Sequence, residues 1–176
     1  MILPNMYVCG GILDVPFDKL YDIGMRCIEV DLDNTLLEPG QSVVSKEIAQ
    51  MISKEKERFR IVIITNTLTD GFTARAERIA QSLSVEVICC RSKDEQKPNI
   101  WPFREGCKRT GIDPSFIAMI GDQSSDIEGA VRAGVYAVMV KPMAWHFWWN
   151  YLRIDKRCRD FMIHRRFRHI ETWGVS

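Results

Sequence analysis

The chain has 176 residues, 46% of them hydrophobic and 27% charged, which indicates an ordinary soluble globular protein long enough to bury a sizeable core. Its formal net charge is only +1, and no apolar run reaches the roughly 18 residues that a membrane span needs. The first residues lack the basic and then apolar pattern of a secretory signal, so we expect a cytoplasmic protein.

Short apolar runs alternate with helical patterns along the chain. The expected strands are 27–32, 60–65, 85–89, 116–121 and 136–140, and the expected helices are 45–57, 72–83, 99–110 and 125–133. The strands are continuous runs rich in valine and isoleucine, as in strands that are buried on both faces. The alternation predicts an α/β protein with a five-stranded parallel sheet between two layers of helices, a three-layer Rossmann-like fold. In such sheets the active site forms at the carboxyl ends of the strands.

Paired carboxylates follow two of the expected strands. Asp31 and Asp33 end the first strand, and their spacing of two directs both side chains to the same side of an extended chain. Asp122 follows the fourth strand, with Asp126 four residues further on. Neighbouring carboxylates repel one another unless a cation lies between them, and oxygen ligands favour a hard ion such as Mg²⁺.

The other strand ends supply groups that suit phosphoryl transfer. The second strand ends in Thr65 and Asn66, and Lys97 follows the third strand after a polar loop. A lysine and a threonine hydroxyl can hold phosphoryl oxygens in the transition state. One aspartate of the first pair can act as the nucleophile, and the second can protonate the leaving oxygen and then activate water.

Each of these motifs alone has a plainer interpretation. Asp-x-Asp and Gly-Asp pairs are common in turns, threonine often caps a helix, and Lys97-Pro98 is typical of a solvated loop. All four motifs occur at successive strand ends, and this common placement favours a catalytic role over a separate explanation for each motif.

In this order the motifs resemble those of the haloacid dehalogenase (HAD) superfamily of phosphatases. DLDNTL resembles the first motif, IIT-Asn66 the second, Lys97-Pro98 the third and GDQSSDI the fourth. The resemblance implies that Asp31 becomes phosphorylated and that Asp33 is the general acid and base. It also implies binding roles for seven residues. Mg²⁺ is held by Asp31, Asp122 and the main-chain carbonyl of Asp33, and Asp126 supports the water shell of the metal. Thr65, Asn66 and Lys97 bind the phosphoryl group.

A closer resemblance covers nearly the whole chain. LPNMYV, IEVDLDNTLLEPG, GDQSSDIEGAVRAGVY and the basic segment after Lys141-Pro142 are similar to the YqeG family of type IIIA HAD phosphatases. That family is related to the mitochondrial phosphatidylglycerophosphate phosphatases. The resemblance therefore implies phosphatidylglycerophosphate as the substrate and phosphatidylglycerol as the product.

The spacing of the motifs leaves no room for a cap domain over the site. Asp33 and Thr65 are 32 residues apart, as are Thr65 and Lys97, which is enough for one helix and one strand in each interval. An open site suits a phosphate that is presented on a large molecule or a membrane surface. We therefore expect a core domain at 1–144, with a short lead-in at 1–25, and a separate tail at 145–176.

The tail is basic and aromatic. Residues 141–176 hold eight lysines and arginines against three acidic residues. A helix over 145–162 would place Arg153, Lys156 and Arg157 opposite a broad apolar face, an arrangement typical of helices that bind anionic lipid. The same helix could instead pack on the sheet with its arginines in solvent. A nucleic-acid partner is not expected, because the aromatic residues lie opposite the charges.

Two further functions remain open beside the lipid phosphatase. The first is a soluble phosphatase that acts on a sugar phosphate or a nucleotide, and the second is a regulatory binding protein that keeps the fold without turnover. The sequence leaves the oligomeric state open. A zinc site is not expected, because the six cysteines form no C-x-x-C pair and the three histidines lie far from Cys89 and Cys90.

Overall fold

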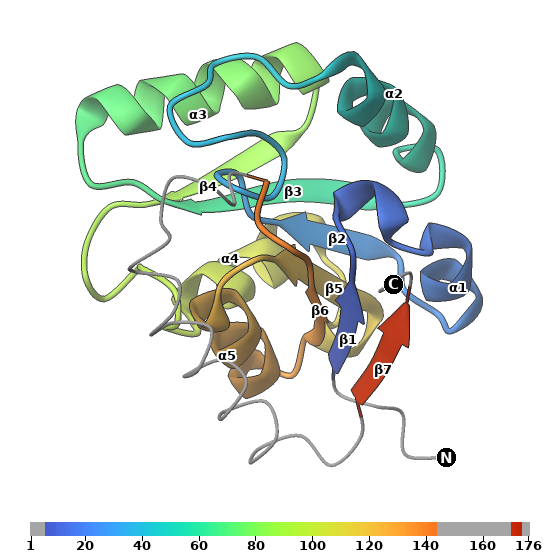
Figure 1. Ribbon diagram of the computed structural model, residues 1–176. Helices are drawn as coiled ribbons and strands as arrows, with labels where there is room; N and C mark the ends of the chain where they lie inside the picture. Colours follow the sequence, from blue (N-terminus) through green and yellow to red (C-terminus); the bar gives the residue numbers. More distant parts are fainter. Residues whose placement is uncertain (1–5, 144–169, 174–176) are drawn as a thin grey trace.

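Seven parallel strands form one sheet in the computed structural model, which describes residues 6–143 and 170–173 (Figure 1). The strands are β1 (Met6–Cys9), β2 (Cys27–Val30), β3 (Arg60–Asn66), β4 (Glu86–Cys90), β5 (Ile117–Gly121), β6 (Tyr136–Met139) and β7 (Ile170–Trp173). Their order across the sheet is β4-β3-β2-β5-β6-β1-β7, and each neighbouring pair is parallel. The two strands that precede the aspartate pairs, β2 and β5, are therefore adjacent in the middle of the sheet.

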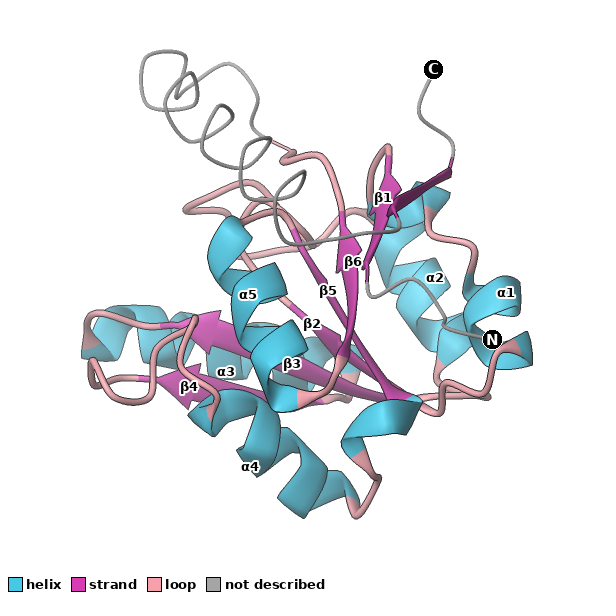
Figure 2. Cartoon of the chain, turned by 90° about the horizontal axis from the view of Figure 1, so that it is seen from below, coloured by secondary structure: helices cyan, strands magenta, loops and turns pink. Residues whose placement is uncertain are grey.

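Helices cover both faces of the sheet, so the fold has three layers (Figures 1 and 2). The helices are α1 (Phe17–Asp22), α2 (Lys46–Glu55), α3 (Asp70–Leu83), α4 (Trp101–Thr110) and α5 (Ser124–Ala133). Buried side chains of α1, α2 and α3 share one apolar cluster with the sheet. Those of α4 and α5 share a second cluster with the opposite face. No helix in the described part of the chain is long and apolar enough to cross a membrane.

Local signals set the ends of these helices. Ser45 and Thr69 precede α2 and α3, and their side chains accept hydrogen bonds from the backbone N–H groups three residues further on. Helices α4 and α5 end at Gly111 and Gly134, which have φ angles of 70° and 79°. Because these angles lie in the left-handed region, glycine ends both helices without strain.

A glutamate lies in the centre of the sheet. Glu29 of β2 is fully buried, and neither of its carboxylate oxygens has a hydrogen-bond partner. Burial raises the pKa of Glu29 well above its usual range. The carboxyl group fits because Gly106 of α4 has no side chain at the point of contact.

The predicted Rossmann-like α/β fold with a parallel sheet is confirmed, and each of the five expected strands is present to within two residues at either end. The sheet nevertheless has seven strands in the described part of the chain rather than five. The additional strands, β1 and β7, are adjacent at one side of the sheet, and β7 is not a continuous apolar run because it contains Glu171 and Thr172.

The intervals between the motifs contain no cap domain. Residues 34–59 hold α2 and its loops, and residues 67–96 hold α3 and β4, all of them described. The expected lead-in at 1–25 contributes β1 and α1, and residues 170–173 of the expected tail form β7. The helix that we expect at 145–162 lies outside the described residues.

Candidate active site

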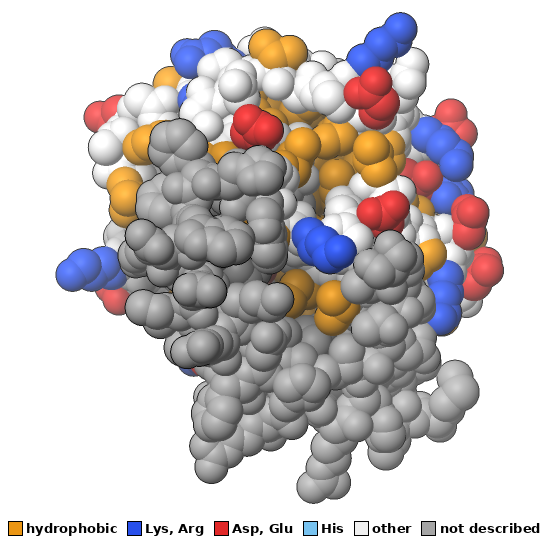
Figure 3. Space-filling model, in the orientation of Figure 1, with side chains coloured by type: hydrophobic (Ala, Val, Ile, Leu, Met, Phe, Trp, Pro, Cys, Tyr) orange, Lys and Arg blue, Asp and Glu red, His pale blue; other side chains and the backbone are white. Residues whose placement is uncertain are grey.

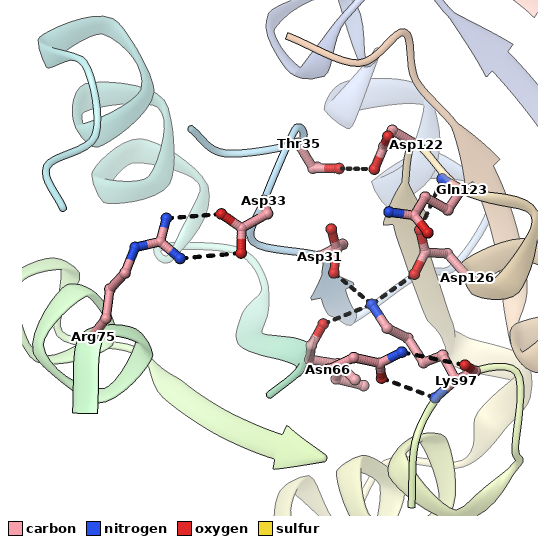
Figure 4. A network of polar contacts seen from close by, with 10 residues as sticks. Asp31, Asp33, Thr35, Asn66, Arg75, Lys97, Asp122, Gln123 and Asp126 are labelled. Carbon is pink, nitrogen blue, oxygen red and sulfur yellow. Dashed lines mark hydrogen bonds and ion pairs between the residues drawn. The ribbon is translucent and has the colours of Figure 1, made fainter. Parts of the chain in front are cut away.

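Four residues from separate segments lie at the carboxyl ends of four adjacent strands. Asp31 follows β2, Lys97 follows β4 and Asp122 follows β5 (Figure 4). Thr65 lies at the end of β3. All four are buried, with exposed fractions between 3% and 6%. The structure thus brings together residues that are up to 91 positions apart in the chain.

Lys97 is at the centre of this group. Its Nζ atom donates to Oδ1 of Asp31 at 2.5 Å, to Oδ1 of Asp126 at 2.6 Å and to the carbonyl oxygen of Ile64 at 2.9 Å. These three contacts use all three N–H donors of an ammonium group. Lys97 is therefore held with its charge between two of the predicted site carboxylates.

The backbone of Lys97 is fixed by Asn66, a predicted phosphate-binding residue. The amide oxygen of Asn66 accepts from the Lys97 backbone N–H at 2.9 Å, and its Nδ2 donates to the Lys97 carbonyl oxygen at 3.2 Å. In this structure the side chain of Asn66 therefore positions the lysine, and a contact of Asn66 with phosphate stays a prediction.

Burial and the charge of the partner have opposite effects on the pKa values of Asp31 and Lys97. Burial raises the pKa of Asp31 to about 7, the charge of Lys97 opposes this rise, and the charge of Asp126 adds to it. Burial alone would lower the pKa of Lys97, but Asp126 and Asp31 together raise it above its ordinary value. Lys97 is thus a fixed positive charge, whereas Asp31 changes its charge near neutral pH.

The three buried aspartates form a candidate metal centre. Asp31, Asp122 and Asp126 each offer a carboxylate oxygen within 4.8 Å of the other two. When ionised, three carboxylates face the single ammonium of Lys97, so a divalent cation would balance the remaining negative charge. Because all the donors are oxygen atoms, the group fits a hard ion such as Mg²⁺.

Asp126 contacts protein donors through both of its carboxylate oxygens. Oδ1 accepts from Lys97, and Oδ2 accepts from the backbone N–H of Gln123 at 3.0 Å at the start of α5. Gly121 has no side chain at the place where a Cβ atom would lie against Asp126. The predicted role of Asp126 in the water shell of a metal is therefore joined by an observed one, the positioning of Lys97.

The side chain of Asp33 lies apart from the three buried aspartates. In Figure 4 it points toward α3, where Nη1 and Nη2 of Arg75 donate to its two oxygens at 3.1 and 2.8 Å. The predicted contact of Asp33 with a metal is through its main-chain carbonyl, and this stays a prediction. The exposed fraction of the Asp33 side chain is 32%, against 9% for Asp31, so Asp33 lies at the open side of the site.

Two residues of the site were not predicted from the sequence. Thr35 lies in the tight turn after Asp33, and its hydroxyl donates to Oδ1 of Asp122 at 3.5 Å. Arg75 is buried, although it lies on a helix at the surface of the fold. The signal for Thr35 was its place within the DLDNTL motif, and the signal for Arg75 was an arginine on the apolar face of the expected helix at 72–83.

Mg²⁺ is expected to bind about tenfold more tightly at pH 8 than at pH 6, because the ion requires the carboxylate form of Asp31 and burial raises that pKa to about 7. The folded-state pKa lies above the ordinary value of 3.8, so the ion-free protein loses stability as the pH rises from about 4 to 7. Titration calorimetry at the two pH values measures the affinity for Mg²⁺. The Asp122→Asn variant is the control, because it shows how far the affinity falls when one candidate ligand is removed. An affinity that stays constant over this range would contradict Asp31 as a ligand.

Residues 33–140 match the family model for haloacid dehalogenase-like hydrolases. The chain belongs to this family. The prediction of an enzyme of the HAD superfamily is therefore confirmed at the level of a hydrolase. A comparison with curated protein sequences finds no significant match.

Solved structures with the same fold include several HAD phosphatases and HAD enzymes. The D,D-heptose 1,7-bisphosphate phosphatase of B. bronchiseptica, solved with magnesium and phosphate, is 19% identical with a TM-score of 0.56, over 65% of this chain and 80% of that one. A HAD family enzyme of Bacteroides thetaiotaomicron, solved with magnesium, is 12% identical with a TM-score of 0.55, over 72% and 99% of the two chains. A putative HAD-like phosphatase of Mesorhizobium loti is 19% identical with a TM-score of 0.53, over 64% and 70%. At these identities the likeness establishes the fold of this HAD hydrolase.

Proposed function

We propose that this HAD hydrolase is a magnesium-dependent phosphomonoester hydrolase that works through a phosphorylated Asp31. The observation that carries the proposal is the placement of the Lys97 ammonium between Asp31 and Asp126, beside Asp122, at the carboxyl ends of the central strands. A buried carboxylate next to a fixed positive charge can attack a phosphorus atom whose oxygens that same charge attracts.

Each residue has a defined part in the reaction. An oxygen of Asp31 attacks phosphorus, and the bond from phosphorus to the leaving oxygen breaks while that oxygen takes a proton from Asp33. In the second half, Asp33 takes a proton from water, the water oxygen attacks phosphorus, and Asp31 is released with phosphate. The charge of Lys97 attracts the phosphoryl oxygens in both halves, and the hydroxyl of Thr65 donates to them. Mg²⁺, held by Asp31, Asp122 and the carbonyl of Asp33, would supply charge neutralisation for the phosphate.

Other HAD structures support this proposal. The heptose bisphosphate phosphatase was solved with magnesium and phosphate, and the Bacteroides enzyme with magnesium. The three buried aspartates of the present chain offer oxygen ligands of the kind that magnesium requires.

The substrate that we propose is a phospholipid phosphate monoester, with phosphatidylglycerophosphate as the specific candidate. The resemblance of the chain to the YqeG family of type IIIA HAD phosphatases supports this choice, and so does the absence of a cap domain from the described intervals between the motifs. We further propose that the protein acts as a cytoplasmic protein at the inner face of a membrane.

Exposed apolar side chains around the site also support a lipid substrate. Six of the seven large apolar residues that are exposed in the described part of the chain lie in segments that follow strand ends, on the side of the site: Leu13, Val43, Leu68, Phe72, Trp101 and Met143. The seventh, Phe116, precedes β5 at the opposite edge. In Figure 3, hydrophobic side chains are grouped on one face between α2 and the upper end of β1, with charged side chains beside them. Exposed apolar residues on the side of the site suit contact with a lipid surface.

The test is phosphate release with Mg²⁺ from phosphatidylglycerophosphate in mixed micelles, compared with a panel of soluble sugar phosphates and nucleotides. The parent enzyme is expected to prefer the lipid. A Leu68→Ser/Phe72→Ser variant is expected to lose lipid hydrolysis by about tenfold, because two apolar contacts with the micelle are removed, and to keep its turnover of soluble esters. Phe116→Ser is the matched control, with an equally exposed aromatic ring at the other edge.

The remaining outcomes separate the other functions. Preference for a soluble ester would support the phosphatase activity and contradict the lipid substrate. An absence of turnover on every ester with Mg²⁺ would overturn the phosphatase in favour of a regulatory binding protein. Flotation with anionic vesicles measures membrane binding independently of turnover.

A further inference from the structure

Arg75 makes three hydrogen bonds that all end in the loop carrying Asp33. Its Nη1 and Nη2 atoms donate to the two oxygens of Asp33, and its Nε donates to the carbonyl oxygen of Gln41 at 2.6 Å. The side chain is 9% exposed, so this guanidinium is almost entirely withdrawn from water. Burying a charge is costly unless it is paired, so the contacts with Asp33 and Gln41 are what keep Arg75 in place.

The form of the contact with Asp33 is specific. Two parallel N–H···O bonds to one carboxylate fix both its distance and its rotation, which a lysine cannot do. A residue needed only to fasten the loop could do so through the carbonyl of Gln41 alone. The contact therefore holds the Asp33 carboxylate in one orientation at the open side of the site (Figure 4).

We propose that Arg75 is a positioning residue for Asp33, which it holds ready for proton exchange with the leaving group and with water. This inference rests on the proposed phosphatase function. Three N–H groups of Arg75 donate to oxygen atoms of the protein. Arg75 lies on α3, on the side of Asp33 that faces away from Asp31 (Figure 4). It acts on the substrate through Asp33 and is not itself a catalytic residue.

The contribution of Arg75 to the reaction depends on the leaving group. When the phosphorus–oxygen bond breaks, the electron pair stays on the leaving oxygen, and the proton of Asp33 moves to it. The carboxylate that remains is the form that Arg75 binds, and it next takes a proton from the attacking water. An alkoxide leaving group needs that first proton, whereas a nitrophenolate is stable without it.

The experiment compares kcat/KM for an alkyl phosphate and for p-nitrophenyl phosphate, because kcat/KM reports the steps up to loss of the leaving group. In Arg75→Met, kcat/KM for the alkyl phosphate is expected to fall by about tenfold to a hundredfold, and that for p-nitrophenyl phosphate by no more than about threefold. For Arg75→Lys, kcat/KM for the alkyl phosphate is expected to lie between the values of Arg75→Met and the parent. Arg75→Lys also carries the test if Arg75→Met does not fold.

The matched control is Arg78→Met, which removes an exposed arginine from the same helix and should change neither value. An equal fall of kcat/KM for both substrates would overturn the inference. A fall caused by a higher KM would indicate that Arg75 contacts the phosphate directly. A fall caused by a lower kcat would indicate a general structural role. A parent enzyme that hydrolyses neither ester would overturn the proposed function, and this inference with it.

Discussion

Asp31→Asn is expected to abolish phosphate release, with a loss of about a thousandfold or more. The substitution keeps the shape of the side chain but replaces the attacking oxygen anion with a neutral amide. Lys97 keeps its contact with Asp126, and burial already raises the pKa of Asp31, so the fold should tolerate a neutral group there. Phosphate release with Mg²⁺ from the best substrate of the parent enzyme measures the loss.

The control for Asp31→Asn is Asp94→Asn, which makes the same chemical change at an exposed position in the loop before Lys97. Its activity should match that of the parent. If Asp31→Asn keeps activity within tenfold of the parent while its fold is intact, Asp31 is not the nucleophile, and the proposed mechanism is wrong.

Lys97→Met is expected to lower the free energy of unfolding by about 3–5 kcal/mol in the absence of divalent ions. The substitution removes the ammonium that lies 2.5 Å from Asp31 and 2.6 Å from Asp126, and it leaves two buried carboxylates without their common partner. Mg²⁺ should restore part of this loss, because a second cation can take the place of the missing charge. Denaturant unfolding in the presence of a chelator and then of Mg²⁺ measures both effects.

An exposed lysine of the same loop gives the control for Lys97→Met. Lys93→Met should change stability by less than about 0.5 kcal/mol, with or without Mg²⁺. A Lys97→Met variant as stable as the parent in the chelator would mean that Asp31 and Asp126 are not coupled through this lysine in solution.

The central part of the fold could be predicted because its strands are continuous apolar runs between polar loops. In β3, Ile61 to Thr65 are all buried, and the sequence there reads as one such run. The strands β1 and β7 were not predicted. β7 contains Glu171 and Thr172, so it is not a continuous apolar run, and within the described residues β1 pairs only with β6 and β7, far along the chain. The central Glu29 shows the same limit, because nothing in the local sequence indicates that Gly106 leaves space for its carboxyl group.

The convergence of the candidate site was predictable for the same reason. Parallel strands bring their carboxyl ends to one edge, so residues that directly follow strands, such as Asp31 and Asp122, must lie near one another. The contact between Asp33 and Arg75 was not predictable, because it joins a loop to the middle of a helix 42 residues later. The helical pattern places Arg75 on the buried side, but which acid it meets depends on how α3 packs.

The position of β1 in the sheet affects how the protein folds. β1 precedes all the other described strands in the chain, yet its partner in the sheet, β6, follows about 130 residues later, as the pairing of Met6 with Ala137 requires. The strands β2, β3 and β4 are neighbours in both sequence and space, so they can pair with one another before β1 pairs with β6. Distant pairings of this kind are slow to form. We therefore expect the closing of the sheet around β1, β6 and β7 to be the last step of folding of this domain.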